Sequence, residues 1–260
     1  MGALQYDEAA TKRLLAVYLT PDVVAQRAQF LQAFRPSTGE RVLDVGSGPG
    51  FLASAIADEV GLTGFVCGVE ISEPLVTVAR SHCAHQSWVE FRHGDATCMP
   101  VECDSFDVAV STQVLEYVAD VDAAIAELFR VVRPGGRVAI LDTDWDSIVW
   151  HSPNRDLMNR ILAAWEEHAP HPRLPRTLTN RLFRAGFRVA PPKIIPLFNA
   201  NYDPDTYSNR MIDLIVSFVV DRRDITRGAA EAWAREVRQA GEQQEYFFSL
   251  NRYLFLATKP

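Results

Sequence analysis

The chain has 260 residues, a net charge of −7 and 48% apolar residues, enough for one large α/β domain or for a core with a sizeable addition. The negative charge argues against nonspecific nucleic-acid binding, and no apolar run approaches the length of a membrane span. The N-terminus lacks a basic-then-apolar signal pattern, and the four cysteines lack metal-ligand spacing. We therefore expect a cytoplasmic protein with reduced thiols, no metal and no nucleic-acid partner.

The first forty residues have a helical pattern that Pro21 and Pro36 interrupt. We expect residues 1–40 to form an N-terminal helical cap. If this segment folds back, it would cover the open end of the sheet predicted by the following residues.

From residue 41 onward, short apolar strands alternate with amphipathic helices. Strands are predicted over 41–45, 65–70, 88–93, 106–111 and 137–142, and helices over 51–60, 73–84 and 121–132. This alternation predicts right-handed crossovers and a doubly wound, mainly parallel sheet of the α/β class. Pro134-Gly135-Gly136 is expected to end the last of these helices and to start the next strand.

After residue 142 the alternation becomes less regular. Helices are predicted over 154–168, 177–185, 204–220 and 228–243, and strands over 187–195 and 253–257. The long helical stretch before the final strand predicts a cap over the sheet. We expect a core over 41–198, a helical cap insertion over 199–250, and the last strand of the core sheet within 251–260.

The most informative segment is residues 42–50, Val-Leu-Asp-Val-Gly-Ser-Gly-Pro-Gly. A buried strand containing Asp44 leads into glycines 46, 48 and 50, and a helical pattern starts at Phe51. A turn without Cβ atoms, followed by the free N–H groups of a helix N-terminus, lets a nucleotide-like ligand approach the backbone. A dinucleotide fingerprint would place its third glycine at Phe51, so an NAD-dependent oxidoreductase is disfavoured.

The G-x-G-x-G spacing with its preceding acid resembles motif I of the class I methyltransferases that use S-adenosylmethionine (SAM). The style of the motifs is similar to that of the broad ubiquinone/menaquinone-biosynthesis group of small-molecule methyltransferases. The resemblance implies a Rossmann-like fold with a seven-stranded, mostly parallel sheet and helical cap segments. It also implies SAM as the methyl donor and S-adenosylhomocysteine as the product.

The resemblance places cofactor-binding residues at the carboxyl ends of successive strands. It implies that Glu70 holds the ribose diol, that Ile71 packs on the adenine, and that Asp95 and the N–H of Ala96 bind the adenine edge. The full set of expected cofactor residues is Tyr18, Arg27, Asp44, Gly46, Ser47, Gly48, Gly50, Glu70, Ile71, Asp95, Ala96, Ser111 and Thr112. Three of these residues have plainer alternatives: Glu70 as a solvated strand end, Asp95 as a turn residue, and Arg27 as a surface residue on an amphipathic helix.

Three residues are candidates for acceptor-side chemistry. Asp144, after the fifth strand, could accept a proton or hold a cationic amine, and His168 could act as a base. Tyr117 could place an aromatic face near the sulfonium. The alternatives are that Asp144 caps the next helix, that its neighbour Trp145 is core, and that His168 is structural.

The sequence predicts a SAM-dependent methyltransferase that acts on a small, largely apolar or aromatic metabolite at O, N or C. A quinone-precursor C-methyltransferase and a non-catalytic SAM-binding protein remain as alternatives. The expected partner is a small-molecule methyl acceptor, and the chain is expected to be a monomer or a homodimer.

Overall fold

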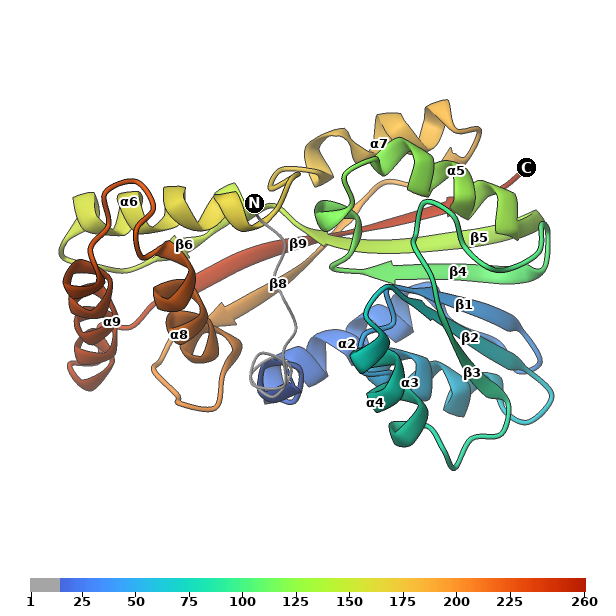
Figure 1. Ribbon diagram of the computed structural model, residues 1–260, viewed down its shortest axis with the longest axis horizontal. Coiled ribbons are helices and arrows are strands. Elements are labelled where there is room, and N and C mark those ends of the chain that lie inside the picture. The colour runs from blue at the N-terminus through green and yellow to red at the C-terminus, as the bar shows by residue number, and fades with distance from the viewer. Residues whose placement is uncertain (1–14) are drawn as a thin grey trace. The chain divides into compact units, whose positions relative to one another are not determined.

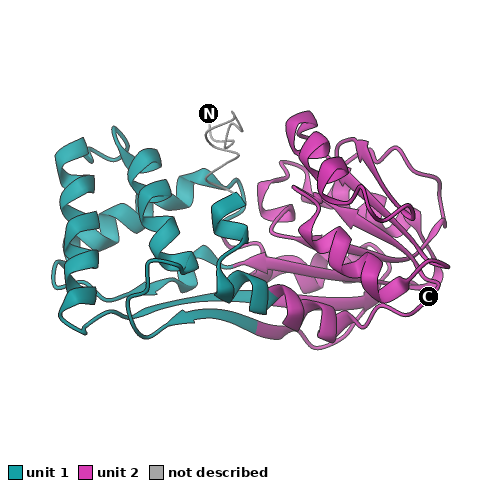
Figure 2. Ribbon diagram, turned by 90° about the horizontal axis from the view of Figure 1, so that it is seen from below, with its two compact units in different colours: residues 1–26, 144–172, 195–252 teal, residues 27–143, 173–194, 253–260 magenta. Residues whose placement is uncertain are grey.

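The computed structural model describes residues 15–260, which group into two compact units (Figure 2). Unit 1 contains the described part of residues 1–26 together with 144–172 and 195–252. Unit 2 contains residues 27–143, 173–194 and 253–260. The boundaries expected from the sequence differ from this division, because residues 144–172 pack with the later helices of unit 1.

Unit 2 contains a parallel sheet with the strand order β3-β2-β1-β4-β5 (Figure 1). The strands are β1 (Arg41–Val45), β2 (Phe65–Glu70), β3 (Val89–His93), β4 (Phe106–Thr112) and β5 (Val132–Thr143). Strands β1, β2 and β4 are buried along nearly their whole length, as expected for parallel strands covered on both faces. The predicted doubly wound α/β sheet is confirmed.

Helices cover both faces of this sheet. Figure 1 shows α3 (Phe51–Val60) and α4 (Glu73–His82) on one side, and α5 (Val121–Val131) and α7 (Pro175–Arg184) on the other. Helix α5 begins where the Asp120 carboxylate accepts the N–H of Ala123, at 2.9 Å. Its buried residues are Val121, Ala124, Ile125, Leu128 and Val131, spaced so that one helical face meets the sheet.

The Pro134-Gly135-Gly136 segment lies inside β5, whereas the sequence analysis placed it before the strand. Strand β5 starts at Val132, and its register against β4 shifts over this segment. Gly135 has φ +78° and donates its N–H to the carbonyl of Lys259, at 2.9 Å. A bulge with a left-handed glycine explains why the strand continues through residues that usually end one.

The sheet contains nine strands among the described residues, two more than the seven expected. The single strand predicted over 187–195 is divided into β7 (Arg188–Val189) and β8 (Lys193–Asn199) by Pro191 and Pro192, which have no N–H to donate. The short strand β6 (Val149–Trp150) was not predicted. Both β6 and β7 pair antiparallel with β9 (Phe248–Thr258), which extends beyond the predicted 253–257.

Unit 1 is built mainly from helices α6 (Arg155–Trp165), α8 (Tyr207–Val219) and α9 (Arg227–Glu242). The side chains of Asn154 and Thr226 cap α6 and α9 by accepting N–H groups three residues later. The core of this unit is rich in aromatic residues, and Trp233 is fully buried within it. Helix α2 (Pro21–Phe34) starts in unit 1 and ends in unit 2.

Three single-turn 3-10 helices connect these elements: η1 (Leu115–Tyr117), η2 (Trp145–Ser147) and η3 (Glu166–His168). Within residues 15–260, no helix is both long enough and apolar enough to cross a membrane.

Candidate functional site

The predicted cofactor residues of unit 2 lie at the carboxyl edge of its parallel sheet. Val45 at the end of β1 is in register with Val69 on one side and with Ser111 on the other. Glu70 at the end of β2 is in register with His93 of β3. The pairing therefore brings the ends of four strands, and the loops that follow them, to one edge of the sheet, where α/β folds bind ligands.

The glycine turn after β1 is tightly held, yet one of its faces is open. Gly46, Gly48 and Gly50 all have positive φ, between +53° and +85°. The N–H of Gly46 bonds to the carbonyl of Val69 at 2.7 Å, and a Cβ on Gly46 would lie 2.3 Å from a methyl group of Val114. A Cβ on Gly48 would meet no atom within 4 Å, so this is the position at which a ligand can approach the backbone.

Glu70 is fixed against the glycine turn. Its Oε2 accepts the N–H of Gly48 and its Oε1 accepts the N–H of Ser72, both at 2.9 Å. The side chain is buried, so the alternative of a solvated strand end is not supported. A carboxylate oxygen can accept more than one hydrogen bond, and each oxygen of Glu70 therefore keeps a site for a hydroxyl donor.

Asp44 is a buried carboxyl group beside Glu70. Burial, followed by the negative charge of Glu70, raises its pKa to about 7, against the lowering effects of the Ala53 N–H and Arg27. Its Oδ2 has no hydrogen-bond partner among the described residues, and neither do the hydroxyls of Ser47 and Ser111. Unsatisfied buried polar atoms next to an open turn are what a site for a polar, cationic ligand requires.

The predicted adenine-binding residues follow two neighbouring strands, Ile71 after β2 and Asp95 and Ala96 after β3. Ile71 is 63% exposed, which is unusual for a large apolar side chain and suits a residue that a flat ring covers. Asp95 is also exposed, and its Oδ1 accepts the N–H and the hydroxyl of Thr97, at 2.8 and 2.7 Å. Asp95 therefore has the turn role that the sequence analysis offered as its alternative. The neighbouring Ala96 is half-buried.

A second group of polar residues, not selected from the sequence, links the ends of β4 and β5. Asp142 accepts the N–H of Val114 at 3.1 Å, while Glu116 accepts the N–H of Thr143 at 2.9 Å. Gln113 has φ +59° and accepts the hydroxyl of Thr143 at 2.5 Å. We call Gln113, Glu116, Asp142 and Thr143 the β4–β5 clamp. The available sequence signal was two acids close to apolar strands, Asp142 within β5 and Glu116 in η1 after β4.

The β4–β5 clamp holds the segment that directly follows β4. Val114, whose N–H the clamp holds, contacts the position that a Cβ on Gly46 would take. Tyr117 is half-buried in η1, directly after this segment, and Thr112 is the half-buried last residue of β4. Both therefore lie in unit 2 at the end of β4, the strand that pairs with β1 ahead of the glycine turn.

Two expected residues come from the N-terminal helical segment. The guanidinium of Arg27 lies 5.2 Å from the ring centroid of Phe51, the first residue of α3, and acts electrostatically on Asp44. Arg27 thus lies next to the residue that follows the glycine turn. Tyr18 belongs to unit 1 and packs partly buried against the core of that unit.

Two of the three catalytic candidates, Asp144 and His168, lie in unit 1, whereas Tyr117 lies in unit 2. Asp144 caps η2 by accepting the N–H of Asp146 at 3.3 Å, and Trp145 is buried in the core. The structure thus shows the capping and core contacts that the sequence analysis gave as alternatives.

His168 is stacked on Trp165, with ring centroids 4.0 Å apart, and meets the edge of Trp145. It is buried, and its Nδ1 lies 2.5 Å from the carbonyl of Trp165. Burial lowers the pKa of His168 to about 4, although the bond to this carbonyl raises it. A neutral, stacked imidazole with such a low pKa is a weak base, and these contacts favour a packing role.

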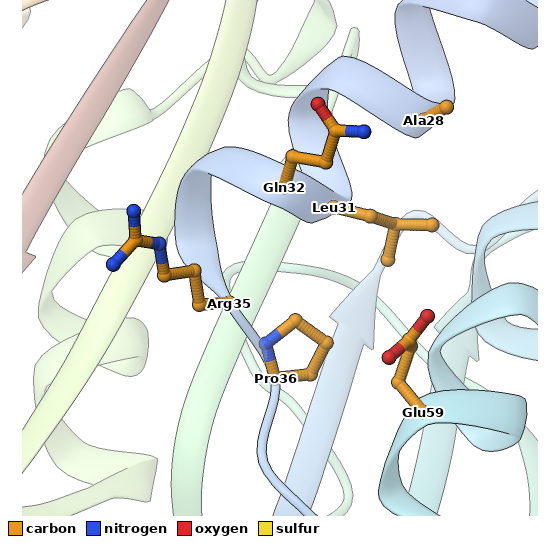
Figure 3. A pocket seen from close by; sticks show the side chains of 6 residues that line it. All are labelled: Ala28, Leu31, Gln32, Arg35, Pro36 and Glu59. Carbon is orange, nitrogen blue, oxygen red and sulfur yellow. The ribbon is translucent and has the colours of Figure 1, made fainter.

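A pocket of about 340 Å³ lies in unit 2 between the C-terminal half of α2 and the end of α3 (Figure 3). Its lining residues are Ala28, Leu31, Gln32, Arg35, Pro36 and Glu59. None of these is an expected cofactor or catalytic residue, so this pocket is not the candidate site.

The residues at the carboxyl edge fit the chemistry of SAM. The glycine turn offers an open backbone surface, Glu70 offers two acceptor oxygens for a diol, and Asp44 offers an unpaired acceptor for an ammonium group. In the described part of the chain, no group of His, Cys, Asp or Glu residues could hold a metal ion.

Comparisons with known proteins point to the same part of the chain. Residues 43–140 match the protein-family model described as a methyltransferase domain. A 37.1 kDa protein of transposon TN4556 from Streptomyces fradiae is 33% identical over 176 residues, which cover 66% of this chain and 49% of that protein. Demethylmenaquinone methyltransferase of Clavibacter sepedonicus is 35% identical over 116 residues, covering 45% of this chain and 46% of that enzyme.

Among solved structures, phosphoethanolamine N-methyltransferase 2 of Haemonchus contortus, in complex with SAM, has a similar fold. The TM-score is 0.64 at 20% identity, and the match covers 98% of this chain and 58% of that one. The chain thus spans about half the length of the two curated relatives and 58% of the length of the Haemonchus contortus enzyme in this structure.

Proposed function

We propose that this chain, whose residues 43–140 belong to the methyltransferase domain family, is a SAM-dependent methyltransferase acting on a small metabolite. The observation that carries the proposal is the glycine turn with Glu70 bonded to its Gly48 N–H, beside the unpaired Oδ2 of Asp44. This combination serves a ligand that carries both a diol and a cationic end. SAM supplies an activated methyl group on a sulfonium, so its transfer needs alignment more than acid–base chemistry.

Each expected cofactor residue has a defined task in this proposal. Glu70 accepts the ribose hydroxyls, Ile71 covers one adenine face, and the turn at Asp95 and Ala96 meets the adenine edge. Asp44 and Arg27 bind the charged amino-acid end, with Asp44 in its ionised form. The hydroxyls of Ser47, Ser111 and Thr112 are additional donors, and Tyr18 is a further proposed cofactor residue.

The acceptor is proposed to be largely apolar or aromatic, with the methyl group entering O, N or C. Tyr117 is the aromatic residue best supported near the sulfonium, because it follows the clamped loop beside the glycine turn. Asp144 remains a candidate for holding an amine or a proton. Trp233, Tyr246 and Phe248 are buried in the core of unit 1.

A quinone precursor is a second candidate acceptor. The similarity to a demethylmenaquinone methyltransferase favours it, although the match covers less than half of either chain. A short-chain demethylmenaquinone analogue, offered together with SAM, distinguishes this candidate from other acceptors.

The test is transfer of an isotopically labelled methyl group from SAM into a bacterial metabolite extract, followed by mass spectrometry. A labelled product that requires the protein and is lost in Glu70→Ala supports the proposal. Binding of SAM without any labelled product would favour the non-catalytic alternative. Absence of SAM binding would contradict both.

A further inference from the structure

One residue of the β4–β5 clamp has a strained backbone. Gln113 has φ +59°, in the left-handed region that favours glycine, although it carries a long side chain. In unit 2, all of whose residues the structure describes, the other non-glycine residues with positive φ are Arg35 and Asp104. Both of these are exposed, whereas Gln113 is half-buried directly after β4. Strain of this kind persists only where surrounding contacts hold it, and it is concentrated at functional sites.

The contacts that hold Gln113 come from the end of β5. Its backbone N–H donates to the carbonyl of Leu141 at 2.8 Å, and its side-chain Nε2 donates to the same oxygen at 3.2 Å. Its Oε1 accepts the hydroxyl of Thr143 at 2.5 Å. A glycine would adopt the left-handed backbone more readily but would lack both side-chain bonds. The amide of Gln113 therefore fastens the bend after β4 to β5.

The bend places Val114 beside the glycine turn. The N–H of Val114 donates to Asp142 at 3.1 Å, and a Cβ on Gly46 would lie 2.3 and 2.8 Å from the two methyl groups of Val114. Strand β1, which leads into Gly46, lies between β2 and β4. On the β2 side, the Gly46 N–H donates to the carbonyl of Val69 at 2.7 Å. Gly46 is therefore confined between β2 and the residue that follows Gln113.

The confinement of Gly46 bears on the open part of the turn. Gly48, where a ligand can approach the backbone, is only two residues further on, and its N–H donates to Glu70 at 2.9 Å. Glu70 in turn directly follows Val69, the partner of Gly46. The open backbone and the carboxylate thus depend on one short segment, and a segment that is already rigid loses less conformational freedom when a ligand binds.

We propose that Gln113 is a positioning residue for the cofactor. Its amide holds the strained bend after β4, the bend places Val114 against Gly46, and the glycine turn is thereby preformed for SAM. The proposal rests on the proposed function, because SAM is the ligand whose site is positioned. Gln113 acts through Val114, so no contact between Gln113 and SAM is needed.

The variant Gln113→Gly separates positioning from stability. Glycine relieves the positive φ while the amide bonds are lost, so the melting temperature should stay within about 3 °C of wild type. The affinity for SAM, measured by calorimetric titration, should fall roughly fivefold or more. A lower melting temperature with unchanged SAM affinity would show a purely structural role and would overturn the proposal.

Arg35→Gly is the matched control. Arg35 has φ +50°, directly follows α2 and is exposed, so glycine relieves the same kind of strain outside the clamp. This variant should keep the SAM affinity of wild type. An equal loss of affinity in Arg35→Gly and Gln113→Gly would show that the effect is not specific to the clamp and would overturn the proposal.

Thr143→Val releases the same amide from the other side. It removes the hydroxyl that donates to Gln113 and leaves the side-chain shape and the backbone of Gln113 unchanged. SAM affinity should fall in this variant as well, and it carries the test if Gln113→Gly does not fold. Wild-type affinity in a folded Thr143→Val protein would overturn the proposal.

A double-mutant cycle tests whether Gln113 acts through Val114. Val114→Ala removes both methyl groups beside Gly46 and should weaken SAM binding by itself. Adding Gln113→Gly to Val114→Ala should then weaken binding by less than about twofold, because residues that act through one contact are not additive. A full additive loss would overturn the proposed route.

The same titrations distinguish this proposal from the proposed function. If wild type binds SAM and all clamp variants bind equally well, the positioning role is overturned and the methyltransferase proposal stands. If wild type does not bind SAM, the proposed function is contradicted, and the positioning role is overturned with it.

Discussion

Two glycines of the turn make it possible to test its backbone conformation separately from the space that it leaves for a ligand. Gly46 and Gly48 both have positive φ, but only Gly46 is packed against another side chain, that of Val114. The two positions therefore form a matched pair for mutation.

Gly46→Ala should destabilise the fold and weaken SAM binding, because its Cβ would lie 2.3 Å from Val114. Gly48→Ala, which meets no protein atom within 4 Å, should cost less stability but still obstruct the ligand. Thermal unfolding and calorimetric titration with SAM measure the two effects. Equal SAM affinity of Gly48→Ala and wild type would show that this face is not the cofactor site.

The adenine assignment is tested at Asp95. Asp95→Ala should weaken SAM binding by about 1–3 kcal/mol, the range for a hydrogen bond to a charged group. Because Asp95 also holds the N–H of Thr97, Asp95→Asn is the control that can keep this turn. Unchanged SAM affinity in Asp95→Ala would leave Asp95 with its turn role alone.

For His168 we expect a substitution that leaves activity unchanged. If it packs and does not act as a base, His168→Phe should retain methyl transfer with an unchanged pH profile of kcat. The folded-state pKa of about 4 lies below the ordinary value of 6.5, so His168 contributes stability above pH 6.5 that is lost as the pH falls toward 4. Loss of turnover in a folded His168→Phe protein would restore its catalytic role.

At the scale of elements, the β4–β5 clamp joins one end of the sheet to the loop beside the glycine turn. Asp142→Ala would leave the N–H of half-buried Val114 without its acceptor and should cost about 1–3 kcal/mol of unfolding free energy. Asp142→Asn can keep the acceptor and should cost less. Chemical denaturation measures both variants, and equal costs would show that the hydrogen bond is not what matters.

The elements also show which parts of the fold were predictable. The strands of unit 2 were predicted well, because buried parallel strands are continuous apolar runs between glycine and proline signals. The bulge at Gly135 was missed, since its conformation is set by pairing with Lys259, far along the chain. The division of 187–195 by two prolines was visible in the sequence, but pairing with β9 could not be inferred from local pattern.

In the candidate site too, residues that belong to a local sequence pattern were predicted, and roles that depend on contacts between distant segments were not. Glu70 was found because an acid at a strand end, at a set distance from a glycine turn, is a local pattern. The roles of Asp142 and Glu116 depend on contacts between segments about 27 residues apart, which periodicity does not reveal. The sequence could not tell that His168 stacks on Trp165 and meets Trp145 edge-on, because those contacts depend on the packing of unit 1.

For the molecule as a whole, Asp44 should make stability depend on pH. Its folded-state pKa of about 7 is above its ordinary value of 3.8, so the folded state holds a proton that the unfolded state releases between these values. Stability from this group is present below about pH 4 and is lost as the pH rises toward 7. Asp44→Asn should flatten this part of the profile of unfolding free energy against pH.

A ligand with an ammonium group favours ionised Asp44, so SAM binding should strengthen as the pH rises through about 7 in the wild type. The same titration of Asp44→Asn should show a weaker dependence. A profile identical to that of the wild type would mean that another group is responsible.

The central claim is that Glu70 and the glycine turn bind SAM, and calorimetric titration of SAM into three proteins tests it most directly. Wild type and Glu73→Ala should bind alike, because Glu73 is an exposed residue that pairs with Arg80 on the surface of α4. Glu70→Ala should bind at least tenfold more weakly. Equal binding by all three proteins, or no binding by the wild type, would contradict the account.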